Sequence, residues 1–451
     1  MMPQVLPRRI AFWSAAAILV GRTIGAGIFR SPASIVNQLP VKLLVLGAWV
    51  AGGLLALCGA LTLAEVASAF PETGGVYVFI REGWGRLPAF LYGWSELVII
   101  RAAGLAAVST AFTEYFLHAV GHTPPIGQPD PWVHYVAAGA IAVIGWLNYR
   151  GVRWGTLLQN STTLIKCGGL LALILLALVL GHHSTGPQMV SPVPPATLGV
   201  VPFGLALISV LWVYHGWADV SLVAGEVKDP TRNLPRVLIL GTLFVMALYV
   251  LANIAYFKVL STEELRHSPL VAAAVADRLV GQPGVVAIGI VVMFSTLGTL
   301  NGSMLTGPRA LWAMAHDGLL FKQLARVHPR YETPHVAILV TTQLGMLFVS
   351  LRTFEQLAAT VVTASLPFYA LAVSAVFLLR QKAGYRPSFR TIGYPVTPLL
   401  FVAATLYLVF AAFANPAARV PTAIIFLVVL AGIPLYWTFV KTGVQEEKMP
   451  A

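Results

Sequence analysis

Long hydrophobic runs recur along almost the whole chain. A hydrocarbon core about 30 Å thick needs about 20 mostly apolar helical residues to cross it. Of the 451 residues, 57% are hydrophobic and 10% are charged, whereas an ordinary soluble protein has roughly 25% charged residues. Inside lipid the backbone must satisfy its own hydrogen bonds, which a helix does internally. The runs therefore predict an all-α integral membrane protein without a sizeable soluble domain.

Twelve runs are long enough to be predicted as transmembrane helices, and together they predict one transmembrane domain over residues 1–451. The first run lacks a small-residue cleavage site and continues into a glycine-rich motif, so it is predicted as a span and not as a signal peptide. The predicted spans are 10–36, 42–68, 87–118, 132–149, 156–181, 201–226, 234–258, 284–315, 334–351, 355–380, 395–414 and 419–441.

The basic residues are distributed unevenly over the predicted loops. With the N-terminus inside, 19 of the 29 Lys and Arg residues lie on the cytoplasmic side, 7 lie outside, and Arg22, Arg101 and Lys166 lie within spans. By the positive-inside rule, we expect a multi-pass protein of the cell membrane with both termini cytoplasmic. The net charge of +12 would suit a nucleic-acid partner only if it formed a basic face on a soluble domain, so no nucleic acid is expected.

Two predicted spans are interrupted by small or polar residues. Span 1 contains GRTIGAGIF from Gly21 to Phe29, and span 6 contains VYHGWADVS from Val213 to Ser221. Because they lie five spans apart, spans 1–5 (10–181) and 6–10 (201–380) would be related by inverted topology, with spans 11 and 12 (395–441) outside the repeat. Paired interruptions in two inverted halves point to a transporter site at mid-membrane.

The glycines of span 1 have a simpler explanation, because small residues spaced four apart allow close helix packing. For Gly21 and Gly25 alone, packing and a break are equally good interpretations. Gly27, followed by Pro32, favours a break. A broken helix exposes carbonyls at the end of its first half and amides at the start of its second half. Helix dipoles add to those partial charges, so the break would suit the ammonium and carboxylate of a free amino acid.

Four motifs in order along the chain carry a family resemblance. GRTIGAGIF followed by SPA, AEVASAFPETGGVYVFIREGWG, GEVKDPTRNLPR and NGSMLTGPRALWAMAHDGLL resemble the amino acid/polyamine/organocation (APC) superfamily permeases. WSELVIIRAAG is similar to the third span of bacterial relatives of the L-type amino-acid transporters. The resemblance implies a leucine-transporter-like 5+5 inverted repeat plus two C-terminal helices. It also implies rocking of spans 1, 2, 6 and 7 against spans 3, 4, 8 and 9.

The predicted substrate site combines the two breaks. The resemblance implies that the span 1 segment holds the substrate backbone and that Trp212 is an aromatic gate. His215 and Asp219 depart from the L-type pattern, which usually has glycine and often a bulky residue there. The candidate substrate-binding residues are Ile24, Gly25, Ala26, Gly27, Ile28, Phe29, Trp212, Tyr214, His215 and Gly216, and the candidate gating or coupling residues are Lys166, Trp212, Arg101 and Asp219.

Lys166 lies about ten residues from either end of span 5, too far to reach the membrane surface easily. A charge so placed is a functional hypothesis by default. In the family, a lysine here resembles a built-in cation where sodium-coupled relatives bind an ion between spans 1 and 8. This interpretation predicts sodium-independent transport. The alternative is a lysine that is simply satisfied by carbonyls.

Other polar residues leave alternatives open. Asp219 is expected to cap the restarting half of span 6, or else to pair with a cationic substrate. His215 could titrate near neutral pH or be a hydrogen-bonded structural residue. Glu96 and Arg101 are five apart, so they are not expected to share a helix face, and Arg101 is expected to meet another helix. Arg22 is a candidate for a cytoplasmic gate network.

Competing functions have little support in the sequence. There is no GxxxxGK[ST], HExxH or GxSxG motif, so neither an enzyme nor an ATP-driven pump is expected. Cys58 and Cys167 are expected to be packing residues, and no metal, cofactor or obligatory protein partner is expected. A channel would need a continuous polar pore, and a nutrient sensor would usually have a long extension. We expect sodium-independent exchange of amino acids; the alternative is proton-coupled uptake of amino acids, including cationic ones, or of polyamines.

Overall fold

The computed structural model describes residues 6–122, 130–182, 199–268, 270–350 and 354–438. The last residue of predicted span 9 and the last three residues of predicted span 12 lie outside this part. So do Arg352, Lys441 and Lys448, which contributed to the charge distribution.

The described residues form helices and no strand, apart from one isolated bridge between Ile10 and Val227. The all-helical class is therefore confirmed. The helices are α1 Phe12–Thr23, α2 Gly27–Gln38, α3 Lys42–Ala69, α4 Val76–Trp84, α5 Arg86–Ser95, η1 Glu96–Ile100, α6 Arg101–Ala119, α7 Pro131–Tyr149, α8 Val152–Leu180, α9 Val200–Tyr214, η3 Asp219–Glu226, α10 Pro230–Val259, α11 Thr262–Arg266, α12 Val271–Val280, α13 Gln282–His316, η4 Lys322–Ala325, α14 His335–Val349, α15 Phe354–Leu379, α16 Val396–Ala414 and α17 Pro416–Leu430.

Ten of the predicted spans match helical segments that are long and apolar enough to cross a membrane in the described part of the chain. Predicted spans 132–149 and 334–351 correspond to α7 and α14. Helix α7 has 19 residues, with polar and aromatic side chains towards its ends, and α14 has 15 residues, whereas about 20 apolar residues are typical of a span. The count of twelve spans therefore stays a prediction.

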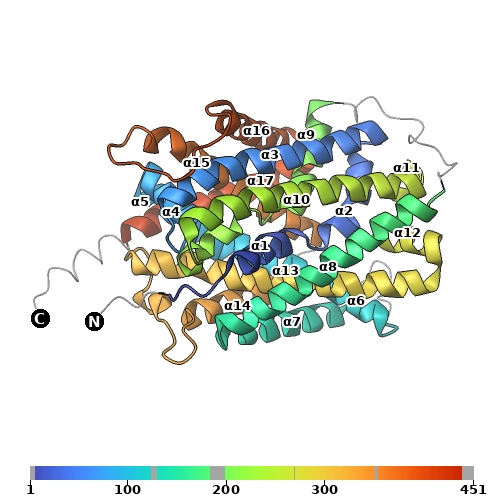
Figure 1. Cartoon of the computed structure of the whole chain (residues 1–451), viewed down its shortest axis with the longest axis horizontal. Coiled ribbons are helices and arrows are strands. Elements are labelled where there is room, and N and C mark those ends of the chain that lie inside the picture. Colours follow the sequence, from blue (N-terminus) through green and yellow to red (C-terminus); the bar gives the residue numbers. More distant parts are fainter. Residues whose placement is uncertain (1–5, 123–129, 183–198, 269, 351–353, 439–451) are drawn as a thin grey trace, which may run out of the picture.

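The helices pack into a bundle with two distinct ends. Helices α4 and α5 lie at one end and α11 and α12 lie at the other (Figure 1). Helix α1 packs against α8, α10 and α13, near the middle of the bundle. Helix α4 lies within the PETGGVYVFIREGWG motif. We refer below to the α4 end and the α11 end.

Helix α8 is built for a lipid environment. Most of its leucines point outward, and Leu164 is 76% and Val179 77% exposed, while Gln159 and Lys166 are completely buried. In a water-soluble protein this polarity would be reversed, because the outer face of a helix would be polar. Ionisable residues within membrane spans characteristically face the bundle interior in this way.

Both predicted helix breaks are confirmed. Helix α1 ends at Thr23 and α2 begins at Gly27, so Ile24 to Ala26 form the break of span 1. Helix α9 ends at Tyr214 and continues only as the 3₁₀ segment η3 from Asp219. Both breaks are buried in protein, which is the setting in which membrane proteins tolerate irregular backbone.

Candidate functional site

The break of span 1 leaves carbonyl groups that no turn of helix can satisfy. Ile24 has a ψ angle of 92°, which turns the chain out of helical geometry. Three side chains from other helices hydrogen-bond to the carbonyls of Gly21 and Ile24. Thr299 in α13 donates to the carbonyls of Gly21 and Ile24 at 3.2 and 3.1 Å, and Ser295 donates to Ile24 at 3.2 Å. The end of α1 is therefore fixed by α13.

Lys166 is the third of these side chains. Its Nζ lies 2.8 Å from the carbonyl of Gly21, 2.6 Å from that of Ile24 and 2.7 Å from that of Ser295. Thr299 Oγ1 is 3.2 Å away. An ammonium group has three protons, and here three carbonyl oxygens accept them. The buried positive charge of α8 thus links the broken end of α1 to α13, the helix of span 8.

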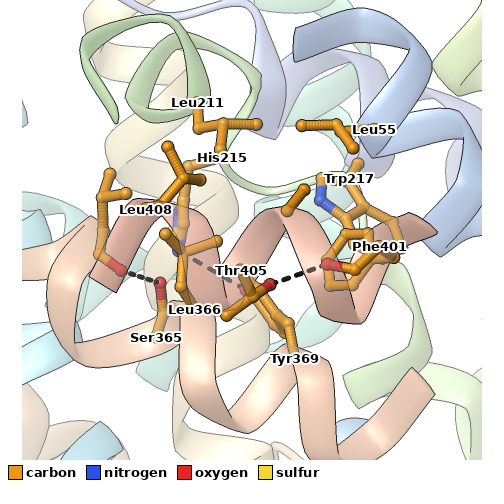
Figure 2. Close-up of a pocket in the computed structure, with 12 residues that line it drawn as sticks. Leu55, Leu211, His215, Trp217, Ser365, Leu366, Tyr369, Phe401, Thr405 and Leu408 are labelled. Atoms are coloured by element: carbon orange, nitrogen blue, oxygen red, sulfur yellow. Dashed lines mark hydrogen bonds between the residues drawn. The ribbon is translucent and has the colours of Figure 1, made fainter. Parts of the chain in front are cut away.

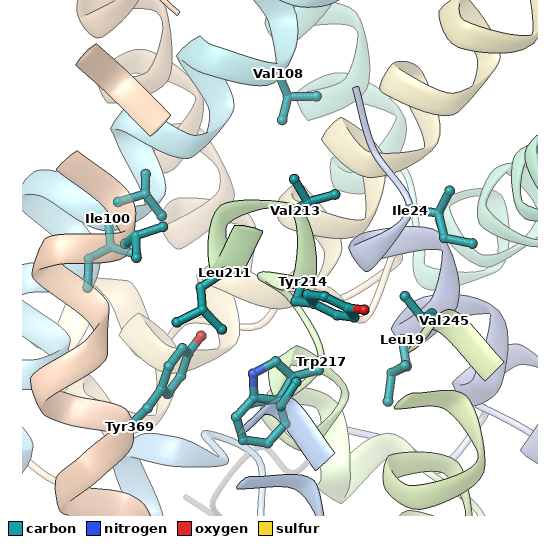
Figure 3. Packing of buried hydrophobic residues seen from close by; sticks show 14 of the residues in the cluster. Leu19, Ile24, Ile100, Val108, Leu211, Val213, Tyr214, Trp217, Val245 and Tyr369 are labelled. Atoms are coloured by element: carbon teal, nitrogen blue, oxygen red, sulfur yellow. The ribbon is translucent and has the colours of Figure 1, made fainter. Parts of the chain in front are cut away.

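The break of span 6 lies directly against span 1. Gly216 has a φ of 113°, and a Cβ atom there would lie 2.7 Å from Cγ of Arg22. Both its conformation and this close approach require glycine. Tyr249 of α10 joins the two breaks, because its hydroxyl lies 2.8 Å from the carbonyl of Thr23 and 3.2 Å from that of Val213. Figure 3 shows the rings of Tyr214, Trp217 and Tyr369 gathered around the break of span 6.

A small cavity lies between the two breaks, with about 300 Å³ of space not occupied by atoms. Its lining combines backbone of span 1 with side chains of three other helices. The indole of Trp212 stacks on the ring of His215, with centroids 6.3 Å apart and planes at 19°. The first amides of α2 have no partner within their own helix, whereas the amide of Phe29 donates to the carbonyl of the N-cap Ala26 at 3.1 Å. The lining residues are Arg22, Thr23, Gly25, Ala26, Gly27, Val108, Trp212, Val213, His215 and Thr299.

Four buried ionised groups lie beside this cavity on the α4 side, and we call Arg22, Glu96, Arg101 and Asp219 the charge cluster. Asp219 Oδ2 is 3.1 Å from Arg22 Nε and 3.0 Å from Arg101 Nη1. Arg101 Nη2 is also 2.9 Å from Glu96 Oε2. All four side chains are at most 5% exposed. Two positive and two negative charges give the cluster no net charge.

The cluster corrects two predictions. Asp219 does not cap the restarting half of span 6: the N-cap is Ala218, with no side-chain cap, and the Asp219 carboxylate accepts from Arg22, Arg101 and Thr306. Glu96 and Arg101 do share a face, because residues 96–100 form a π-helix. Its i to i+5 repeat brings residues five apart together. The expectation that Arg101 also meets other helices is confirmed by Asp219 and Ser303.

More ion pairs fill the α4 end. Arg309 of α13 and Glu226 of η3 form a two-contact pair at 2.8 and 3.2 Å, with both side chains 1% exposed. The backbone of Ile10 pairs with the segment after η3. Arg81 and the Tyr77 hydroxyl of α4 both contact the carboxylate of Asp317 at the end of α13. Burial and the neighbouring Asp317 raise the pKa of Tyr77, so its hydroxyl stays a donor.

Comparison with known protein families identifies the chain's relatives. The sequence model described as "Amino acid permease" matches residues 10–434, which include both breaks, Lys166 and the charge cluster. The chain belongs to the amino acid permease family. The predicted membership of the APC superfamily is thereby confirmed, and the permease is a multi-pass membrane protein.

Three relatives show the range of proteins similar to this permease. The b(0,+)-type amino acid transporter 1 of Homo sapiens is 31% identical, over 96% of this chain and 88% of the relative. The serine/threonine exchanger SteT of Bacillus subtilis (strain 168) is 28% identical, over 97% and 98%. The cystine/glutamate transporter of Homo sapiens is 30% identical, over 96% and 86%. These alignments cover nearly the whole permease.

The structure brings half of the ten candidate substrate-binding residues of the permease to the cavity: Gly25, Ala26, Gly27, Trp212 and His215. Ile24 gives its carbonyl to Lys166. Ile28 and Phe29 are buried in the core, and Tyr214 points to α3, where its hydroxyl donates to the Trp49 carbonyl at 3.2 Å. Gly216 packs on Arg22.

Several residues of this site were not predicted. Tyr249, Ser295 and Thr299 hold the breaks, and Tyr369 of α15 lies 3.4 Å from His215 Nε2 (Figure 2). A tyrosine or threonine in an apolar span resembles any packing residue, so composition gives no signal. A spacing argument would have helped at Thr299, since it lies one helical turn from Ser295 and shares its face.

Proposed function

We propose that this permease carries free L-amino acids by alternating access and works as a sodium-independent exchanger. The observation that carries the proposal is the cavity between the two helix breaks. Amides at the start of α2 offer partners for a carboxylate. Carbonyl oxygens at the ends of α1 and α9 each have two lone pairs, so those that already accept one hydrogen bond can also accept one from an ammonium. A zwitterion can be held there largely by backbone.

Sodium independence is supported by Lys166. Its ammonium occupies carbonyl oxygens contributed by both α1 and α13, which are oxygens that a cation bound between these helices would need. A protein-borne positive charge in that position makes a coupling ion unnecessary for fixing the end of α1.

Neutral substrates fit the charge cluster better than cationic ones. Asp219 contacts Arg22, which lines the cavity, and Arg22 and Arg101 already compensate the charge of Asp219. A cationic side chain would have to displace one of them from a buried pair, which is unfavourable. This argues against the cationic amino-acid and polyamine alternatives.

Alternating access is supported by a difference between the two ends of the bundle, since ion pairs join the helices at the α4 end and a cavity separates them at the α11 end. The charge cluster and the Glu226–Arg309 pair link η3 to α1, α6 and α13 at the α4 end. At the α11 end a larger cavity lies between α9, α15 and the start of α17. We place the α4 end in the cytoplasm, together with both termini, and assign 10–181 and 201–380 to the two inverted repeats of a twelve-span carrier.

Uptake by purified protein in proteoliposomes tests the proposal. Vesicles preloaded with amino acid are expected to take up labelled amino acid faster than empty vesicles, at equal rates in sodium and choline buffers. No stimulation by preloading would exclude exchange, and a strict need for sodium would exclude the role proposed for Lys166. Uptake that instead follows an imposed proton gradient would support the proton-coupled alternative.

A further inference from the structure

Helices α7 and α8 present apolar outer faces that end in arginines. Both helices lie along one side of the bundle together with α14 (Figure 1). On α7 the exposed face includes Val143 and Trp146, and the next residue on that face is Arg150. Helix α8 begins nearby with the exposed residues Arg153 and Trp154. Tryptophans are enriched where the apolar membrane core meets the headgroups, so these arginines lie at the level of the lipid headgroups.

Two arginines converge on one aromatic ring at this position. The guanidinium carbon of Arg150 lies 5.6 Å from the ring centroid of Tyr331, and that of Arg330 lies 5.7 Å from the same centroid. Arg150 also lies 5.1 Å from the ring centroid of Trp146. We call Arg150, Arg153 and Arg330 the arginine edge. Aromatic rings attract cations but do not neutralise them, and like charges repel each other, so the arginine edge favours an anion as a further partner.

No carboxylate of the protein supplies that anion. Glu332 is the only acidic residue in the two segments that meet here, 146–157 and 321–335, and its Oε2 lies 2.5 Å from Nη2 of Arg9. Among the described residues, none forms an ion pair with an arginine of the edge. The positive-inside rule accounts for the number of basic residues on this side of the membrane. It does not account for the convergence of two of them on one ring.

The loop that carries Arg330 is fixed to the end of α7. The Thr333 hydroxyl donates to the carbonyl of Tyr149 at 3.0 Å. The Nδ1 atom of His328 accepts from the amides of Arg330 and Tyr331, both at 3.2 Å, and its ring stacks on that of Tyr331 with centroids 4.4 Å apart. The fold therefore brings the two guanidinium groups together before any ligand arrives, which lowers the entropy cost of binding one.

We propose that the arginine edge binds the phosphate group of an anionic phospholipid. A guanidinium group can form two parallel hydrogen bonds with phosphate oxygens, and basic clusters beside membrane helices attract anionic lipids. The exposed rings of Trp146 and Trp154 continue the site into the membrane, which favours a lipid over a free phosphate ion. A zwitterionic lipid fits less well, because its ammonium group would meet arginines and find no free carboxylate.

Lipid binding by the purified, delipidated permease tests the proposal. The protein in a non-ionic detergent is titrated with dioleoyl phosphatidylglycerol, dioleoyl phosphatidylcholine or inorganic phosphate. Native mass spectrometry measures the bound ligand, and the melting temperature is recorded in parallel. The test variant combines Arg150→Gln with Arg330→Gln. The matched control combines Arg386→Gln with Arg390→Gln, which removes the same charge from exposed positions between α15 and α16. The measurement needs no amino acid, so its outcome does not depend on the function proposed above.

We expect the unmodified protein and the control variant to bind phosphatidylglycerol at least 10-fold more tightly than phosphatidylcholine, and to melt at a higher temperature when it is bound. The test variant should bind phosphatidylglycerol at least 10-fold more weakly, because each basic residue at the membrane surface adds to the attraction. Equal binding by the test and control variants would overturn the proposal. Displacement of the lipid by an equal concentration of inorganic phosphate would also overturn it, since the ligand would then be a soluble anion.

A single variant keeps the test decisive if the double variant is unstable without lipid. Arg330→Gln alone removes one guanidinium group from an exposed loop and is expected to weaken phosphatidylglycerol binding at least 3-fold. Unchanged binding by this variant would contradict the proposal.

Discussion

The charge cluster allows a quantitative prediction for Asp219→Asn. The unmodified cluster holds two arginines and two carboxylates, all at most 5% exposed, and is neutral. The substitution leaves one buried positive charge uncompensated. Removing one partner from a buried ion pair costs about 3–5 kcal/mol. Because the asparagine oxygen can still accept from one arginine, we expect the lower end, about 3 kcal/mol.

A cost of that size shifts the conformational equilibrium away from the state with the α4 end closed by a factor of about 100. We therefore expect Asp219→Asn to lower the melting temperature in detergent and to reduce amino-acid uptake by at least 10-fold. Glu332→Gln is the control, because the Arg9–Glu332 pair has side chains 61% and 40% exposed and such pairs contribute about 0–1 kcal/mol.

A double variant separates charge balance from the loss of one hydrogen-bond acceptor. Arg22→Gln combined with Asp219→Asn leaves the Glu96–Arg101 pair intact and restores neutrality. We expect the double variant to melt at a higher temperature than Asp219→Asn alone. A single variant as stable as the unmodified protein, or a double variant less stable than the single one, would refute the electrostatic reasoning.

Three further substitutions test the breaks and the closure. Lys166→Met is expected to abolish most uptake with little loss of thermal stability. The stability should persist because Thr299 still bonds to the carbonyls of Gly21 and Ile24 and because a buried charge is removed. Unchanged uptake would contradict the role proposed for Lys166. Gly216→Ala should lose most uptake, because the φ of 113° at Gly216 and the 2.7 Å approach to Arg22 exclude a Cβ atom. The control Gly289→Ala should keep its uptake, because the space around Gly289 is open. Glu226→Gln should lower the melting temperature more than Glu332→Gln does, because Arg309, the partner of Glu226, is completely buried. Equal shifts in melting temperature would count against a role of the Glu226–Arg309 pair in closing the α4 end.

The breaks could be predicted because they interrupt a strong pattern. Gly25 and Gly27 in one apolar run, and Gly216 with Asp219 in another, weaken helices that lipid otherwise enforces. Lys166 could be singled out for the same reason, since a charge in the middle of a span needs a partner. The sequence does not show which atoms that partner supplies, because the carbonyls of Gly21, Ile24 and Ser295 meet only in the fold.

The charge cluster shows where local rules fail. The expected cap at Asp219 follows a rule about neighbouring amides, but arginines far away in the sequence interact more strongly with a buried carboxylate. The expected separation of Glu96 and Arg101 assumes 3.6 residues per turn, and the π-helical turn between them breaks that assumption. No composition signal marks such a turn, because it forms where tertiary contacts, here those of Arg101 with Asp219 and Ser303, stabilise it.

The central claim is that the broken helices recognise the ammonium and carboxylate of a free amino acid. It is tested most directly by competition against labelled amino-acid uptake with two analogues of a transported amino acid, the decarboxylated amine and the N-acetylated acid. Both analogues keep the side chain and lose one of the two charged groups. We expect each to compete at least 100-fold more weakly than the parent, because each leaves one end of the site without its partner. An amine or an N-acetyl acid that competes as well as the parent would contradict the account.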